Sequence, residues 1–301
     1  MQEELGVGLF SGVAEDIYHQ LPGVSQSQLK YMSEWSPKHL KWKKDHPDDP
    51  EESDTLALGG AVHDAVLLPD VFDAQYMTAG PCEGVTGKGN QCSNAGKDRF
   101  GGHWFCGTHA PKDQERDGGV VLTAREYEVC MGIRGSVHTD PDASVLLNCE
   151  RKELTAVWED EATGLLCRGR FDCLSDDGTV ITDLKTARSA KPELFNKAVY
   201  QYGYNLQAYH YLSGARALGL PAEVFACIPV EKVEPFCLCV GQVDDEAVEA
   251  GGKELRVLMR RFAECAESGH WPGYRSPTVF TLPAYAWKQI EERVDNAEVE
   301  E

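Results

Sequence analysis

Two carboxylates and an ammonium group stand close together near the middle of the chain. Asp172 ends the string GRFD, and after ten intervening residues Asp183 and Lys185 belong to the string DLKT. Carboxylate oxygens are hard ligands for Mg²⁺ or Mn²⁺, and a cation beside them can stabilise charge developing on a phosphate. Together these groups are suited to metal-dependent hydrolysis of a phosphodiester, in which Lys185 orients or deprotonates a water or stabilises charge.

Strand patterns around these residues would bring them together. A period of two puts Arg168, Arg170 and Asp172 on one face of their strand. The same period puts Asp183 and Lys185 on one face of the next strand. The turn strings EATG and SDDG separate three predicted strands of an antiparallel meander, at 153–160, 165–174 and 179–186.

The remaining patterns predict a mixed α/β (α+β) fold with a central sheet flanked by helices. Two further strands are predicted, over 224–231 and 236–243. Helices are predicted over 29–44, 57–68, 123–137, 192–200, 203–218 and 245–267. Ser25 or Ser27 would cap the first of them, and Thr123 with Glu126 has capping-box spacing before the third.

Composition limits the class of protein. The 301 residues include 29 Lys+Arg and 49 Asp+Glu, so the net charge is 29 − 49 = −20, and 42% are hydrophobic. This predicts a folded protein whose surface as a whole does not bind nucleic acid, although a basic channel inside an acidic shell stays possible. No apolar run approaches the ~20 residues of a membrane helix, and the acidic start lacks signal-peptide features, so a cytoplasmic location is expected.

The most basic segment is the predicted helix over 29–44. Its lysines and aromatic residues alternate, which fits either a solvated helix face or contact with a phosphate backbone. They are Lys30, Lys38, Lys41, Lys43 and Lys44 with Tyr31, Trp35 and Trp42.

Cysteines form a second motif. Eleven are present, and without an export signal they predict reduced thiols or metal ligands rather than disulfides. Cys82, Cys92, Cys106 and His109 have the spacing C-x9-C-x13-C-x2-H in a polar, glycine-rich segment. Such ligands suit tetrahedral Zn²⁺, with His103 as an alternative fourth ligand. Since this segment has few apolar residues to bury, metal binding would be what orders it.

After the DLKT string, Gln207 and Tyr211 lie on one face of a predicted helix. The order G…D, D-x-K, Q-x-x-x-Y resembles the PD-(D/E)XK nuclease superfamily and its RecB-like branch. The strings SQSQLKYMSEWSPKHL, LALGGAVHDAVLL, ELTAVWEDEATGLLCRGRFDCL, TDLKTARSA, YGYNLQAYHYL and ESGHWPGY are similar to phage and prophage exonuclease VIII (RecE-type) nucleases. The resemblance covers about residues 18 to 285 outside the cysteine segment.

The resemblance implies roles for particular residues. It places metal ligands at His63, Asp172 and Asp183 and the catalytic lysine at Lys185. It places a supporting acid at Glu153. Gln207 and Tyr211 would lie beside the active site and the bound strand. The cysteines do not match the iron–sulfur pattern of some RecB-like relatives.

The expected layout has four parts: an N-terminal helical part (1–79), an inserted zinc-binding segment (80–118), the nuclease core (119–285) and an acidic C-terminal tail (286–301). The resemblance implies a Mg²⁺-dependent exodeoxyribonuclease that digests linear double-stranded DNA from its ends, 5′→3′, and leaves a 3′ strand for a single-strand annealing protein. It also implies a ring-shaped homo-oligomer. The alternatives are a RecB-like nuclease of other polarity or substrate, and a zinc-organised binding module on an inactive nuclease fold.

Overall fold

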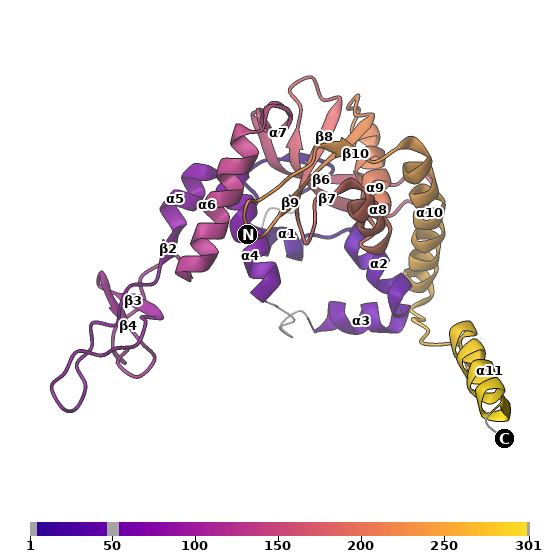
Figure 1. Cartoon of the computed structure of the whole chain (residues 1–301). Coiled ribbons are helices and arrows are strands. Elements are labelled where there is room, and N and C mark those ends of the chain that lie inside the picture. The colour runs from indigo at the N-terminus through magenta and orange to yellow at the C-terminus, as the bar shows by residue number, and fades with distance from the viewer. Residues whose placement is uncertain (1–4, 47–53, 300–301) are drawn as a thin grey trace.

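The fold of the computed structural model, which describes residues 5–46 and 54–299, is built on a six-stranded mixed sheet (Figure 1). The strand order is β1-β6-β7-β8-β9-β10. The three predicted meander strands pair antiparallel, and β8 pairs parallel with β9. The strands of the sheet are β1 (Gly8–Phe10), β6 (Arg151–Glu159), β7 (Leu166–Leu174), β8 (Val180–Ala187), β9 (Val224–Glu231) and β10 (Gly241–Gln242).

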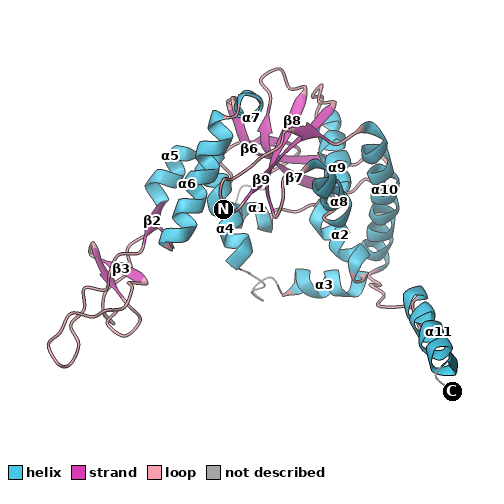
Figure 2. Ribbon diagram, in the orientation of Figure 1, coloured by secondary structure: helices cyan, strands magenta, loops and turns pink. Residues whose placement is uncertain are grey.

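Helices cover both faces of this sheet (Figure 2). One layer contains α2, α8, α9 and α10, and the other contains α4, α6 and α7. The helices are α1 (Glu15–Gln20), α2 (Gln26–Glu34), α3 (Pro37–Asp45), α4 (Asp54–Leu67), α5 (Pro69–Gln75), α6 (Ala124–Thr139), α7 (Pro141–Leu147), α8 (Pro192–Gln201), α9 (Tyr204–Ala217), α10 (Asp245–Ser268) and α11 (Ala284–Val299). None of the described helices is long and apolar enough to cross a bilayer.

Burial explains why the layers stack on the sheet. Leu154, Phe171 and Phe225 pack into a cluster with α9 and α10, whereas Leu184 and Ile228 pack against α4 and α6. Alternate side chains of a strand point to opposite faces, so strands buried on both sides need apolar residues at most positions. Polar residues inside such strands therefore need a separate explanation, and the two buried aspartates, Asp172 and Asp183, lie at one place.

That place is where β7 and β8 separate. The two strands are registered only at Cys173↔Thr182 and Leu174↔Ile181, so the pairing stops just before Asp172 and Asp183. On the other side of β7, β6 keeps its register past Glu153, whose φ is +49°. A left-handed backbone is strained for a residue other than glycine. Phe171 and Leu174, three positions apart on β7, pack in the same hydrophobic cluster.

Two predicted elements are wrong in extent. The helix predicted over 29–44 is two helices, because Trp35 and Ser36 leave helical geometry and Ser36 caps α3, whose first residue is Pro37. Proline is well placed at the first helical position but lacks the N–H that a helix interior needs. The strand predicted over 236–243 is reduced to β10 and an isolated bridge between Val230 and Leu238.

The cysteine segment projects from the rest of the molecule (Figure 1). Its stem is a parallel pair of short strands, β2 (Tyr76–Thr78) and β5 (Val120–Leu122). It contains a hairpin of β3 (Asp98–Phe100) and β4 (His103–Phe105), which the sequence did not predict. We call residues 79–119 the zinc arm.

Three other expectations are corrected or limited. The acidic C-terminal tail contains the helix α11, which lies apart from the sheet (Figure 1). Cys149 and Cys173 form a disulfide, so the prediction of reduced thiols is wrong for this pair. Charge also predicts a solvated segment for the acidic string DHPDDPEESD over 45–54, and most of it lies outside the described residues.

Candidate active site and zinc cluster

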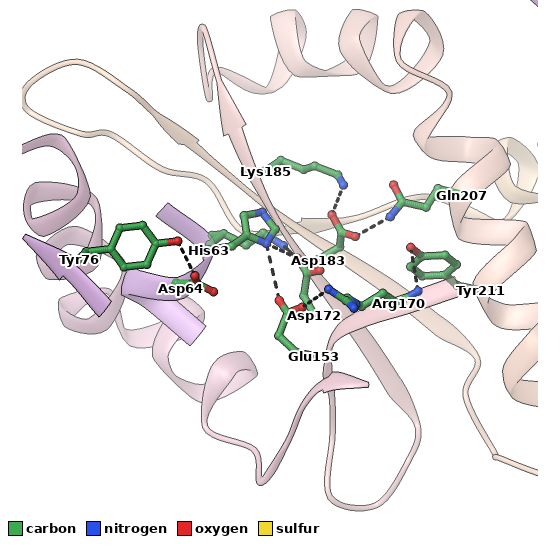
Figure 3. Close-up of polar contacts among 11 residues, drawn as sticks. His63, Asp64, Tyr76, Glu153, Arg170, Asp172, Asp183, Lys185, Gln207 and Tyr211 are labelled. Carbon is green, nitrogen blue, oxygen red and sulfur yellow. Dashed lines mark hydrogen bonds and ion pairs between the residues drawn. The ribbon is translucent and has the colours of Figure 1, made fainter. Parts of the chain in front are cut away.

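Three predicted site residues form a group that fits a metal ion. The potential ligand atoms of His63, Glu153 and Asp172 lie within 4.8 Å of one another. Nδ1 of His63 is 3.6 Å from Oδ2 of Asp172 and 3.9 Å from Oε1 of Glu153 (Figure 3). An imidazole with two carboxylates is a donor set that accepts a divalent cation.

Asp183 and Lys185 lie on the other side of the gap between the strands. Lys185 forms an ion pair with Oδ2 of Asp183, and Nε2 of Gln207 donates to Oδ1 of Asp183 at 2.6 Å. Asp183 is thus held by α9, whereas Asp172 faces α4 (Figure 3). The negative charge of Asp183 still acts on Asp172 across the gap between β7 and β8.

The charges in this group are strongly coupled. Burial, followed by the negative charge of Asp183, raises the pKa of Asp172 to about 7. Burial opposes the charge of His63, but Asp172 and Glu153 outweigh it and raise the pKa of the imidazole to about 9. Burial likewise opposes the charge of Lys185, and Asp183 and Asp172 outweigh it, so its pKa lies above the usual range. A bound divalent cation would replace the proton on His63 and offset the repulsion between the carboxylates.

Arg170 supports the acidic side of the site. Its Nη1 is 3.9 Å from Oε2 of Glu153, and its Nη2 donates to the carbonyl of Val13 at 3.0 Å. Its guanidinium also lies 4.4 Å from the ring centroid of Tyr18 on α1. Arg170 therefore forms a structural ion pair with Glu153, and α1 packs over this side of the site.

Tyr211 is mainly a packing residue. Its hydroxyl accepts a 3.4 Å hydrogen bond from the backbone N–H of Arg170, and its ring packs against Phe171 and Phe225. A Cβ at position 169 would lie 2.8 Å from this ring, so Gly169 is what permits the close approach.

The sequence analysis missed two contacts. The ring of Tyr204 lies 4.8 Å from Nζ of Lys185. Its spacing of three residues from Gln207 places both on one helix face and could have revealed it. The second is the hydrogen bond that Tyr76 donates to Asp64 at 2.6 Å, which ties the stem of the zinc arm to the residue after His63 (Figure 3). No sequence spacing reveals that contact.

The cysteine motif converges as expected. Sγ of Cys92 and Cys106 are 3.9 Å apart, and Nδ1 of His109 lies 3.5 Å from Cys82 Sγ and 3.4 Å from Cys106 Sγ. Zn–S bonds of ~2.3 Å and Zn–N bonds of ~2.0 Å would separate tetrahedral ligands by ~3.8 Å between sulfurs and ~3.5 Å between sulfur and nitrogen. All four ligand atoms lie within 4.8 Å of one another, so the cluster fits zinc.

His103, the alternative fourth ligand, lies elsewhere. Its Nδ1 is 2.7 Å from Oε2 of Glu83, and its side chain is exposed. His109 instead packs against Gly84, where a Cβ would be 2.4 Å from the imidazole. The geometry therefore favours His109.

Comparisons with known proteins agree with this fold. A family described as a PDDEXK-like domain of unknown function matches residues 25–277. The chain belongs to this family, and its predicted fold and its place in the PD-(D/E)XK superfamily are confirmed. No curated protein matches the chain.

A solved structure is similar over nearly the full length. It is the crystal structure of a protein titled "Putative exonuclease" from Eubacterium rectale, with a TM-score of 0.59 and 15% sequence identity. The alignment covers 92% of this chain and 96% of that chain. At this identity the likeness shows the fold, and the roles of individual residues stay predictions.

Proposed function

We propose that this protein is a Mg²⁺-dependent exodeoxyribonuclease that hydrolyses linear double-stranded DNA from its ends. The observation that carries the proposal is the group of His63, Glu153 and Asp172 next to the ion pair of Asp183 with Lys185, where β7 and β8 part. Buried carboxylates repel each other, so a protein without use for a cation there would lose stability for no gain. Membership of a PDDEXK-like family supports the same chemistry.

Each residue has a role that follows from its contacts. His63, Asp172 and Glu153 would hold Mg²⁺ or Mn²⁺, and Asp183, predicted as a ligand, would join them from the opposite side. The bound ion would polarise the phosphate and activate the attacking water. Lys185 keeps its proton beside Asp183, so it stabilises negative charge on the phosphate rather than accepting a proton. Gln207 fixes the carboxylate of Asp183, and Arg170 fixes Glu153.

The zinc arm would hold a structural Zn²⁺ through Cys82, Cys92, Cys106 and His109. Four protein ligands close the coordination shell, so the ion has no open position for catalysis. The ion would order a segment whose buried hydrophobic cluster consists of the three cysteines, with Phe100 buried outside that cluster.

Polarity and assembly follow from the resemblance to exonuclease VIII-type nucleases. We propose 5′→3′ digestion that leaves a 3′ single strand for a single-strand annealing protein, by a ring-shaped homo-oligomer in the cytoplasm of a bacterial host. A ring lined with lysines and arginines would reconcile DNA binding with a net charge of −20.

The test uses linear duplex DNA labelled separately at its 5′ and 3′ ends, with a closed circular duplex as the matched substrate control. With Mg²⁺, label should be released from the linear DNA first at the 5′ end, and EDTA should stop the reaction. Equal cleavage of circular DNA would overturn the requirement for an end. Absence of cleavage of duplex and single strands with both Mg²⁺ and Mn²⁺ would favour the binding module on an inactive fold.

A further inference from the structure

The helices α2 and α3 carry an exposed row of aromatic rings. Trp35 directly follows α2, and His46 directly follows α3. Within α3, His39 and Trp42 are three residues apart and lie on one helix face. Ring centroids are 5.7 Å apart for Trp35 and His39 and 4.6 Å apart for Trp42 and His46. We call these four residues the aromatic row. Leu40, on a different face of α3, is buried in the core, so the row is not a core-facing stripe.

Lysines border this row on both sides. On a helical projection Lys38 falls on one side of the aromatic positions and Lys43 on the other. Lys41 is exposed next to Lys38 and pairs with Asp45 at 2.6 Å. Residues 26–46 contain five lysines and two acidic residues, a balance of 5 − 2 = +3 in a chain whose net charge is −20. The row is therefore a basic area on an acidic protein.

The combination of rings and lysines fits one kind of partner. The side chains of Trp35 and Trp42 are each 52% exposed, and large exposed apolar groups mark interaction sites when they cluster. Lysines alone would suffice to contact the phosphates of a duplex, whose bases are already stacked. Exposed indoles strengthen binding only where bases are unpaired, because unpaired bases stack on aromatic side chains irrespective of sequence.

We propose that the aromatic row binds single-stranded DNA, with bases stacked on Trp35 and Trp42 and phosphates contacted by Lys38, Lys41 and Lys43. This inference rests on the proposed nuclease function, because the strand is the single-stranded part of that enzyme's substrate or product.

The fold provides a route from the active site to the row. At the start of α2, Nε2 of Gln26 donates to the carbonyl of Gly203 at 3.2 Å. The next residue, Tyr204, places its ring beside Lys185. From there α2 runs for nine residues, or ~13 Å at ~1.5 Å per residue, before Trp35. A strand that leaves the site along α2 meets the row at the end of this helix.

The experiment measures binding of fluorescently labelled oligo(dT) of ~20 nucleotides in EDTA, where no cleavage interferes. Stacking of a base on an aromatic side chain is worth ~1–3 kcal/mol, so W35A/W42A should bind at least ~30-fold more weakly. W35F/W42F, which keeps rings for stacking, should stay within about threefold of the unaltered protein. The matched control is Trp287→Ala on α11, because Trp287 is 52% exposed, as Trp35 and Trp42 are. This variant should bind oligo(dT) as the unaltered protein does.

Two further readouts separate stacking from charge. K38Q/K43Q should reduce the slope of log K against log[salt] by ~1.4, at ~0.7 per phosphate contact for single strands. W35A/W42A should bind blunt duplex DNA nearly as tightly as the unaltered protein binds it. Circular dichroism and thermal unfolding of each variant establish that α2 and α3 are intact, and a second double variant without rings, W35Q/W42Q, replaces W35A/W42A if that protein does not fold.

Binding of oligo(dT) by W35A/W42A within twofold of the unaltered protein would overturn the proposal. A lower assembly mass of W35A/W42A in gel filtration, with unchanged DNA binding, would also overturn the proposal. That result would assign the row to a contact between copies, for example with the acidic helix α11. If the protein cleaves no DNA but the tryptophan variants lose oligo(dT), the nuclease function fails and the row stands. If the protein cleaves DNA but the tryptophan variants bind oligo(dT) as the unaltered protein does, the nuclease function stands and the proposal for the aromatic row fails.

Discussion

The carboxylate of Asp172 accepts a 2.8 Å hydrogen bond from the backbone N–H of Leu184, just beyond the last paired residues of β7 and β8. The side chain thus satisfies a backbone donor that the neighbouring strand has left without its ladder bond. The same oxygen, Oδ2, faces His63 at 3.6 Å. Asp172 therefore both ends the pairing of the strands and supplies charge to the candidate metal site.

Replacing Asp172 by asparagine separates these two functions. The amide oxygen can still accept from Leu184, but the charge is lost. We expect nuclease activity to fall at least ~100-fold, because a metal ligand is lost. We also expect the variant to be more stable than the unaltered protein in EDTA at pH 8, by about 1 to 4 kcal/mol.

The direction of this change in stability follows from the raised pKa of Asp172. Asp172 titrates at about 7 in the folded protein because of burial and Asp183, against ~3.9 when unfolded. The folded state holds the proton more tightly, so the contribution of this group is present below pH ~4 and is lost as the pH rises through 7. Urea unfolding in EDTA from pH 4 to 8 measures it. A variant that is less stable than the unaltered protein at pH 8 contradicts this account.

Lys185→Met should remove activity while leaving metal binding in place. The ammonium pairs with Asp183 and keeps its proton there, and a protonated amine has no lone pair to offer a metal ion. We expect a loss of ~100-fold or more in kcat, the size found for removal of a single electrostatic stabiliser, with little change in KM for DNA. Single-turnover digestion and calorimetric titration with Mn²⁺ check the two parts. Lys253→Met, an exposed lysine of α10, is the control.

Gln207 and Tyr211 should differ, although they belong to the same helix motif. Gln207 donates a 2.6 Å hydrogen bond to the buried Asp183, whereas the hydrogen bond at Tyr211 is 3.4 Å long. We expect Gln207→Leu to lower activity ~10-fold or more, since it leaves a buried carboxylate short of a donor. Tyr211→Phe keeps the packing against Phe171 and should cost less than about threefold. Equal losses in the two variants would assign the Tyr211 hydroxyl a direct role.

The sequence predicted the parts of this site that depend on local periodicity. Alternation along the strands placed Asp183 with Lys185, and helix spacing placed Gln207 with Tyr211. It did not predict that Asp172 and Asp183 contact opposite helical layers. That arrangement depends on where two strands stop pairing, which has no local signal in the sequence.

The errors in secondary structure have equally specific causes. Lysines and aromatics at helical spacing continue from α2 through α3, and this periodicity outweighed the Ser36-Pro37 signal for a new helix start. The apolar run over 236–243 resembled a strand, but apart from the single bridge between Leu238 and Val230 only Gly241 and Gln242 pair with β9. Strand pairing is a tertiary property, so an apolar run alone does not establish it.

The zinc arm yields a prediction that does not involve catalysis. The purified protein should contain one zinc per chain by elemental analysis, and Cys106→Ser should lose it. Loss of zinc should expose the arm to limited proteolysis between residues 79 and 119, because few apolar contacts remain to order it. His103→Ala should keep its zinc, since His103 is paired with Glu83 outside the cluster. Full zinc content in Cys106→Ser would show that the cluster is not the binding site.

His210 lies in the core, away from the metal site, and its protonation should make the stability of the protein depend on pH. Its Nε2 lies 3.1 Å from the carbonyl of Arg168, and its ring packs 4.6 Å from that of Trp158. Burial lowers the pKa of His210 to about 4, against ~6.5 when unfolded. The unfolded chain therefore binds the proton more readily, so the contribution of His210 is complete above pH 6.5 and is lost as the pH falls toward 4.

This shift corresponds to about 3 kcal/mol at ~1.4 kcal/mol per pKa unit. His210→Gln retains a donor for the Arg168 carbonyl but does not titrate. We expect it to be less stable than the unaltered protein at pH 7.5, where it loses packing on Trp158, and to approach or exceed its stability at pH 5. Urea unfolding in EDTA at both pH values measures the difference. His270→Gln, an exposed histidine that follows α10, should leave the curve unchanged. A constant difference between His210→Gln and the unaltered protein at the two pH values would mean that His210 accepts a proton in the folded state without cost.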